Sequence, residues 1–176
     1  MTKLRLATMW LDGCSGCHMS LLDVDEALIT IAQKADLVYS PLVDAHEYPE
    51  NVDVAIVEGA LGTEEDIEKI RLVRSRTRIL VALGDCAITS NVSGMRNQFP
   101  VKPMMEQIYI DNAEGQQVIP TVGVPVLLKH AIPLHDAVKV DLHVPGCPPP
   151  APTILYVLTE LLEGRMPDLR RRTHFG

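Results

Sequence analysis

Apolar and polar residues follow each other in this chain in a pattern that changes from segment to segment. Short runs with strand character cover 4–8, 36–40, 52–57, 79–83 and 138–144. The run over 79–83 is apolar throughout, which is typical of the buried centre of a parallel sheet. The pattern therefore predicts about five strands.

Between these runs, apolar residues recur at helical spacing. This spacing predicts helices from 17 to about 33, from 63 to about 76, and over 153–163. Thr63 and Asp66 are spaced as in a capping box, and acidic residues begin this second helix while arginines end it. Strands that alternate with helices predict an α/β fold.

The stretch over 91–137 departs from this pattern, because its periodicity is weak and it contains five prolines. We expect mostly loop with short helices there. Loops of this length are often functional, for example as a surface that binds a partner.

Together these elements predict a doubly wound, flavodoxin-like parallel sheet of about five strands with helices on both faces. With 176 residues, the chain is expected to form a single domain over 1–176. In such sheets, ligands bind outside the carboxyl ends of the strands.

The net charge and the hydropathy of the chain argue against several classes of protein. The net charge of −7 argues against a general nucleic-acid binder, which would present a basic face. No segment approaches the roughly 20 continuous apolar residues of a membrane-spanning helix. The N-terminus shows no secretory pattern, so we expect a cytoplasmic protein without a membrane partner.

The chain contains four cysteines, and each follows a predicted strand in a loop with glycine. They are Cys14 and Cys17 after the first strand, Cys86 after the strand over 79–83, and Cys147 after the last. A reducing compartment argues against a disulfide framework. Four thiolates that converge on one sheet edge are what a cubane iron–sulfur cluster requires.

Other interpretations of the cysteines remain open at this point. A structural zinc site usually draws on two closely spaced ligand pairs, whereas only Cys14 and Cys17 form such a pair. A thioredoxin-like dithiol would fit that pair but leaves Cys86 and Cys147 without a role. A flavodoxin-like fold also leaves FMN open as a ligand, although Ser15 is the one hydroxyl residue among the cysteines of the first loop.

Several motifs resemble the small subunit of [NiFe]-hydrogenases, in that family's order and over nearly the whole chain to about Gly164. They are WLDGCSGCHMS over 10–20, VEGA over 57–60, GDCA over 84–87 and PGCPP over 145–149. The segments CHMSLL over 17–22 and YPENVD over 48–53 are most similar to the small subunit of cytoplasmic, bidirectional NAD-reducing hydrogenases.

The resemblance implies that Cys14, Cys17, Cys86 and Cys147 ligate one proximal [4Fe-4S] cluster beside the Ni-Fe site of a large subunit. The chain would pass electrons from there to diaphorase subunits with FMN and further iron–sulfur clusters, where NAD is reduced. It would be a subunit of an oxidoreductase without being catalytic alone. Glu58 would position a cluster loop or take part in proton movement, or simply cap amides at a strand end.

Two features of the cysteines sharpen this prediction. Many small subunits of the family continue into a second domain with more clusters, but no cysteine follows Cys147 here, so we expect no such multi-cluster domain.

The alternative to a hydrogenase subunit is the related cluster-bearing subunit of a complex I-like NADH:quinone oxidoreductase. That family has adjacent cysteines in its first motif, whereas two residues separate Cys14 from Cys17.

Overall fold

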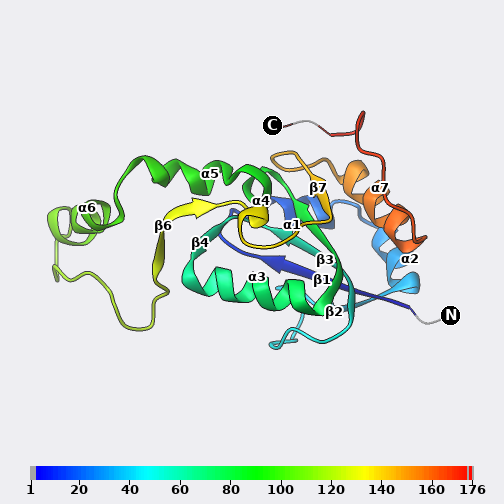
Figure 1. The fold of residues 1–176 in the computed structure, drawn as a ribbon, viewed down its shortest axis with the longest axis horizontal. Helices are drawn as coiled ribbons and strands as arrows, with labels where there is room; N and C mark the ends of the chain where they lie inside the picture. Colours follow the sequence, from blue (N-terminus) through cyan, green and yellow to red (C-terminus); the bar gives the residue numbers. More distant parts are fainter. Residues whose placement is uncertain (1–2, 174, 176) are drawn as a thin grey trace.

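The computed structural model describes residues 3–173 and 175 and contains a central parallel sheet (Figure 1). Its five strands run in the order β2-β1-β3-β5-β7. They are β1 (Leu4–Trp10), β2 (Ala35–Tyr39), β3 (Val52–Glu58), β5 (Thr77–Leu83) and β7 (Leu142–Val144). All four neighbouring pairs are parallel, so the predicted doubly wound sheet is confirmed.

Helices cover both faces of this sheet, as predicted. Helices α1 (Gly16–Leu22), α2 (Ala27–Lys34) and α7 (Ala151–Leu162) bury Leu21, Ile31 and Ile154 against one face. On the other face, α3 (Glu64–Arg76) and α4 (Asp85–Thr89) bury Ile70, Val73 and Ala87. The expected capping box begins α3, because Thr63 Oγ1 accepts the Asp66 amide at 3.1 Å and Asp66 Oδ2 accepts the Thr63 amide at 2.9 Å.

The single helix predicted from 17 to about 33 is wrong, because two helices, α1 and α2, occupy that segment. Asp25 between them has a φ of 50°, a left-handed conformation that aspartate tolerates better than most residues. The break leaves Val24 buried in the core while Asp25 and Glu26 face solvent. The last strand is also shorter than predicted, since β7 covers only Leu142–Val144.

The stretch over 91–137 contains the expected short helices together with a strand that the prolines concealed. The helices are α5 (Asn91–Gly94), η1 (Met95–Gln98), α6 (Val101–Glu106), η2 (Gln107–Asp111) and η3 (Leu134–Asp136). Strand β6 (Leu127–Ile132) pairs antiparallel with β4 (Leu61–Thr63) in a second, two-stranded sheet. This pairing joins segments far apart in the sequence, so local periodicity does not predict it.

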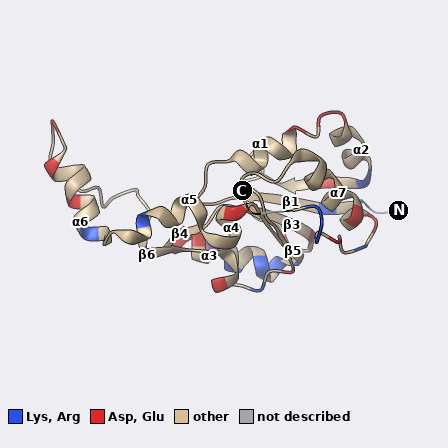
Figure 2. Ribbon diagram, turned by 90° about the horizontal axis from the view of Figure 1, so that it is seen from above, with Lys and Arg blue, Asp and Glu red and all other residues tan. Residues whose placement is uncertain are grey.

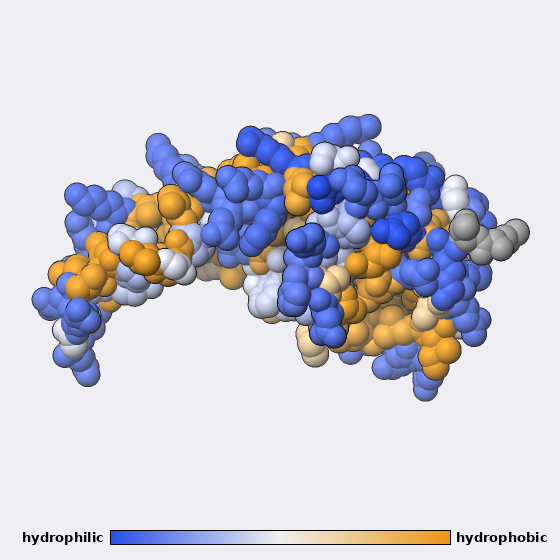
Figure 3. Space-filling view, turned by 90° about the horizontal axis from the view of Figure 1, so that it is seen from below, coloured by the Kyte–Doolittle hydropathy of each residue, from blue (hydrophilic) through white to orange (hydrophobic). Residues whose placement is uncertain are grey.

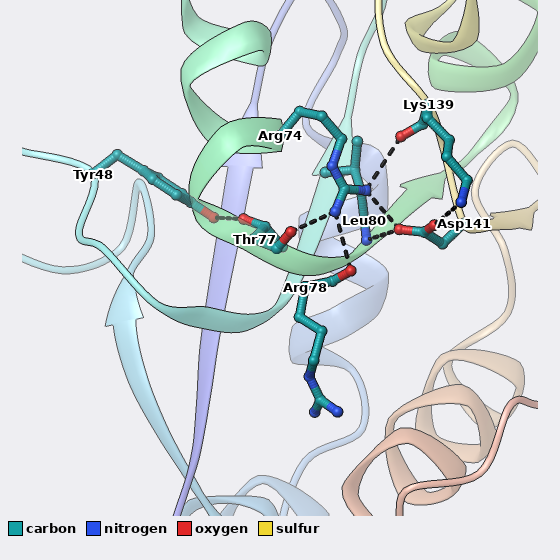
Figure 4. A network of polar contacts seen from close by, with 7 residues as sticks. All are labelled: Tyr48, Arg74, Thr77, Arg78, Leu80, Lys139 and Asp141. Carbon is teal, nitrogen blue, oxygen red and sulfur yellow. Dashed lines mark hydrogen bonds and ion pairs between the residues drawn. The ribbon is translucent and has the colours of Figure 1, made fainter.

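A polar network ties α3 to the segment before β7 (Figure 4). Asp141 Oδ2 accepts the Leu80 amide at 2.9 Å and an Arg74 N–H at 2.5 Å, and Arg74 also donates to the carbonyls of Thr77 and Arg78. Burial alone would raise the pKa of Asp141, but the Leu80 amide and Arg74 outweigh it and hold this pKa below its ordinary value. The network therefore helps to hold β7 in register with β5, although only three residues of each strand pair in the sheet.

No helix in the described part of the chain is long and apolar enough to cross a membrane.

Candidate metal centre

Four neighbouring strands, β1, β3, β5 and β7, end on one row of the sheet. Trp10 of β1 pairs with Glu58 of β3, Glu58 with Leu83 of β5, and Leu83 with Val144 of β7. The loops that carry the cysteines begin directly after this row, so parallel pairing brings them to the same edge. The structure thus confirms the prediction that all four cysteines lie in segments that follow the carboxyl ends of the strands.

The first loop holds Cys14 and leads into α1, whose first turn contains Cys17. Ser15 has a φ of 65°, and its carbonyl accepts the Met19 amide at 3.1 Å. Backbone bonds between Asp12 and Ala60, at 2.7 and 3.1 Å, tie this loop to the one that follows Glu58. Cys14 is exposed and Cys17 is half-buried, so one thiol faces outward and the other faces the protein.

Asp85 holds the other two cysteine loops together. Its carboxylate accepts the Gly146 amide at 2.7 Å, and its own amide donates to the Gly146 carbonyl at 2.9 Å. Cys86 and Cys147 are the residues that directly follow these two. Asn91 adds a side-chain bond, because its amide donates to Cys147 Sγ at 3.3 Å. Sequence reasoning missed both Asp85 and Asn91 as residues of the site.

Gly84 allows the cysteine loops to meet. Its φ is +83°, and a Cβ built on it would lie 2.2 Å from Cys17 Sγ. The Cys17 thiol therefore packs against the backbone that leads into the Cys86 loop. Only glycine has both the conformation and the space for this contact.

The surroundings of two of the thiols favour their protonated forms. Burial raises the pKa of Cys17, and the negative charge of Glu58 raises it further. Burial also raises the pKa of Cys86, and the neighbouring thiolates of Cys14 and Cys147 add to this rise. Such thiols lose their protons readily only when a metal supplies positive charge, since thiolates are the metal-binding form. The donor set therefore fits an iron–sulfur cluster.

Glu58 is fully enclosed, which its position in the sequence did not reveal. Its Oε2 accepts the His18 backbone amide at 2.7 Å and lies 3.2 Å from His18 Nδ1, and its carboxylate is within hydrogen-bonding reach of the Cys17 thiol. On the other side of its ring, His18 Nε2 forms a hydrogen bond of 3.0 Å with Thr8 Oγ1. The Thr8 hydroxyl in turn donates to Ser40 Oγ at 2.8 Å. This buried chain fixes Glu58 beside the first turn of α1.

The rival cysteine chemistries find little support in this geometry. Cys14 and Cys17 are the one closely spaced cysteine pair in the sequence, whereas a structural zinc site usually draws on two such pairs. A dithiol formed by Cys14 and Cys17 would leave Cys86 and Cys147, which follow strands that end at the same sheet edge, without a role. All four cysteines are free thiols.

Comparison with known proteins places this site in a family. The family model described as NADH ubiquinone oxidoreductase, 20 Kd subunit, matches residues 14–161. The delta subunit of the NAD-reducing hydrogenase HoxS of Cupriavidus necator is 37% identical, over 95% of this chain and 82% of its own length. One subunit of the F420-non-reducing hydrogenase vhu of Methanocaldococcus jannaschii is 34% identical, and this chain spans only 58% of that longer relative.

Solved structures agree with these relatives. A chain of an NAD+-reducing [NiFe]-hydrogenase in the H2-reduced state superimposes with a TM-score of 0.95 at 37% identity, over 99% of this chain and 100% of that chain. A chain of the Dm. baculatum [NiFeSe]-hydrogenase shares the fold, with a TM-score of 0.60 at 19% identity over 70% of its length. The chain therefore belongs to the family of the NADH ubiquinone oxidoreductase 20 Kd subunit and, within that family, to the small subunits of hydrogenases.

Proposed function

We propose that this chain carries the proximal [4Fe-4S] cluster of an NAD-reducing [NiFe]-hydrogenase and relays electrons through it. The observation that carries this proposal is that Cys14, Cys17, Cys86 and Cys147 all follow strands that end at one sheet edge, where the charges of Cys14 and Cys147 act on Cys86. When bound there, a [4Fe-4S] cluster supplies one-electron transfer. Hydrogen oxidation releases two electrons, which would cross this chain one at a time.

The residues around the thiols have roles of their own. Asn91 donates to Cys147 Sγ, and donors to sulfur stabilise the added negative charge of a reduced cluster. Asp85 holds the Cys86 and Cys147 loops at a fixed spacing through its two bonds with Gly146. Glu58 accepts the His18 amide, so it locks the turn that carries Cys17 onto β3. We therefore assign Glu58 a positioning role.

The partners follow from this function. We propose a large subunit with the Ni-Fe site on one side of the relay, and diaphorase subunits with FMN, further clusters and the NAD site on the other. Free thiols suit a reducing compartment, so we place the complex in the cytoplasm. The one set of four cysteines supports a single cluster and a single cluster-binding domain over 1–176.

Two alternatives have less support. A complex I-like subunit shares the family model, but the relatives described above are hydrogenase subunits. FMN on this chain has less support, because Cys14 and Cys17 occupy much of the loop that would hold a phosphate and Ser15 is the one hydroxyl residue between them.

Assays of the isolated chain test whether it transfers electrons without oxidising hydrogen. We expect the purified chain, reconstituted with iron and sulfide, to accept electrons from a chemical reductant but to consume no hydrogen. Hydrogen uptake should appear only when the large subunit is added. Steady hydrogen consumption by this polypeptide alone, with no nickel present, would contradict the proposed relay function.

A further inference from the structure

An arm formed by residues 99–126 extends away from the body of the molecule. It contains α6 and η2, which lie at the end opposite α2 and α7 in two perpendicular views (Figures 1 and 2). Its root is firmly held, because the Asn97 side chain exchanges two hydrogen bonds, of 2.7 and 2.8 Å, with the Ala131 backbone. Arg96 adds bonds to the carbonyls of Gly62 and Leu128, at 2.9 and 3.1 Å.

The arm exposes apolar side chains instead of burying them. Val122 is 92% exposed, Phe99 61%, Val126 59% and Ile108 50%. Apolar surface is visible along the arm in Figure 3. Helix α6 has six residues and buries none of them, and a helix shorter than about 12–15 residues is marginal without tertiary contacts. An apolar surface of this extent marks an interaction site.

Exposed apolar side chains also lie between the arm and the cysteine edge. Met95 of η1 is 64% exposed, and Val92 of α5 is 55% exposed. The neighbouring Asn91 contacts Cys147 Sγ directly, and the backbone of Val92 lies within hydrogen-bonding reach of Cys86. A partner that covers the cysteine edge therefore lies close to the exposed Val92 and Met95, which lead to the arm.

We propose that the arm, together with Val92 and Met95, is the docking surface for the hydrogenase large subunit. This inference rests on the proposed function, which requires the metal site of that subunit to lie against the cysteine edge. Stable interfaces between subunits are large and apolar. A rigidly rooted apolar arm beside the cysteine edge suits the subunit whose metal site must lie against that edge.

The test is recovery of the large subunit with a tagged form of this chain from cells that express the whole complex. Ile108→Asp and Val122→Asp place a charge in the proposed interface without disturbing a core residue. We expect each to lower the recovered large subunit at least tenfold. Ile29→Asp is the matched control, because Ile29 is 66% exposed on α2, at the other end of the molecule, and recovery should not change.

Three results would overturn the inference: unchanged recovery, loss of only the flavin-bearing subunits, and loss of only self-association between copies of this chain. Iron and labile sulfide on the recovered chain are measured in parallel and should equal the wild-type content. A wild-type chain without iron would refute the proposed function separately, whereas the recovery assay reports on the docking surface alone.

Discussion

Replacing Cys147 with serine will stop hydrogen-dependent NAD reduction by the assembled complex. Serine offers a hydroxyl in place of the thiolate that iron prefers, and Cys147 lies on an exposed loop with no spare thiol to replace it. Changing a residue that only supports a metal ligand costs about 10–100-fold in activity, so loss of a ligand itself should exceed about 100-fold.

The assay for Cys147→Ser separates electron relay from hydrogen chemistry. NAD reduction with hydrogen should be lost, whereas hydrogen isotope exchange in the mature large subunit should continue, because exchange requires no net electron flow. EPR of the reduced complex should show the cluster signal lost or altered. Unchanged NAD reduction in this variant would rule out Cys147 as a ligand.

Gly84→Ala should remove the cluster although it changes no ligand. The new methyl group would lie 2.2 Å from Cys17 Sγ, on a backbone whose φ of +83° disfavours alanine. Either the Cys17 turn or the Cys86 loop must then move, and strain of this kind costs about 1–3 kcal/mol. We expect iron content to fall at least fivefold and the thermal unfolding midpoint to drop.

Gly115→Ala is the matched control for this substitution. A Cβ at Gly115 has no atom within 4 Å, so the isolated chain should keep its iron content and stability, and Gly164→Ala, at a φ of +74° with open space and outside the arm, should keep its iron content as well. A Gly84→Ala variant that keeps full iron and the wild-type spectrum would show that the two loops do not need their close approach.

Much of the fold was predictable because it is encoded locally. Apolar runs revealed the five strands of the main sheet, and Thr63 with Asp66 revealed the start of α3. The break near Asp25 escaped prediction, because the apolar spacing continues on both sides of a single left-handed residue. Strand β6 escaped because its partner β4 lies about 65 residues earlier and is only three residues long.

The sequence predicted where the four cysteines lie, but not which polar residues surround them. Cysteines next to glycine at strand ends indicate a shared edge, since parallel strands present their carboxyl ends together. The roles of Asp85 and Asn91 depend on side-chain directions that no spacing reveals. The burial of Glu58 depends on Thr8, His18 and Ser40, which come from three separate segments.

Iron and acid-labile sulfide, measured per chain on anaerobically purified protein, decide whether the four cysteines hold a cluster. We expect about four of each, no stoichiometric flavin, and an EPR spectrum of a reduced cubane after reduction. Zinc in place of iron would contradict the proposed electron relay. So would four free thiols that take up no iron during anaerobic reconstitution.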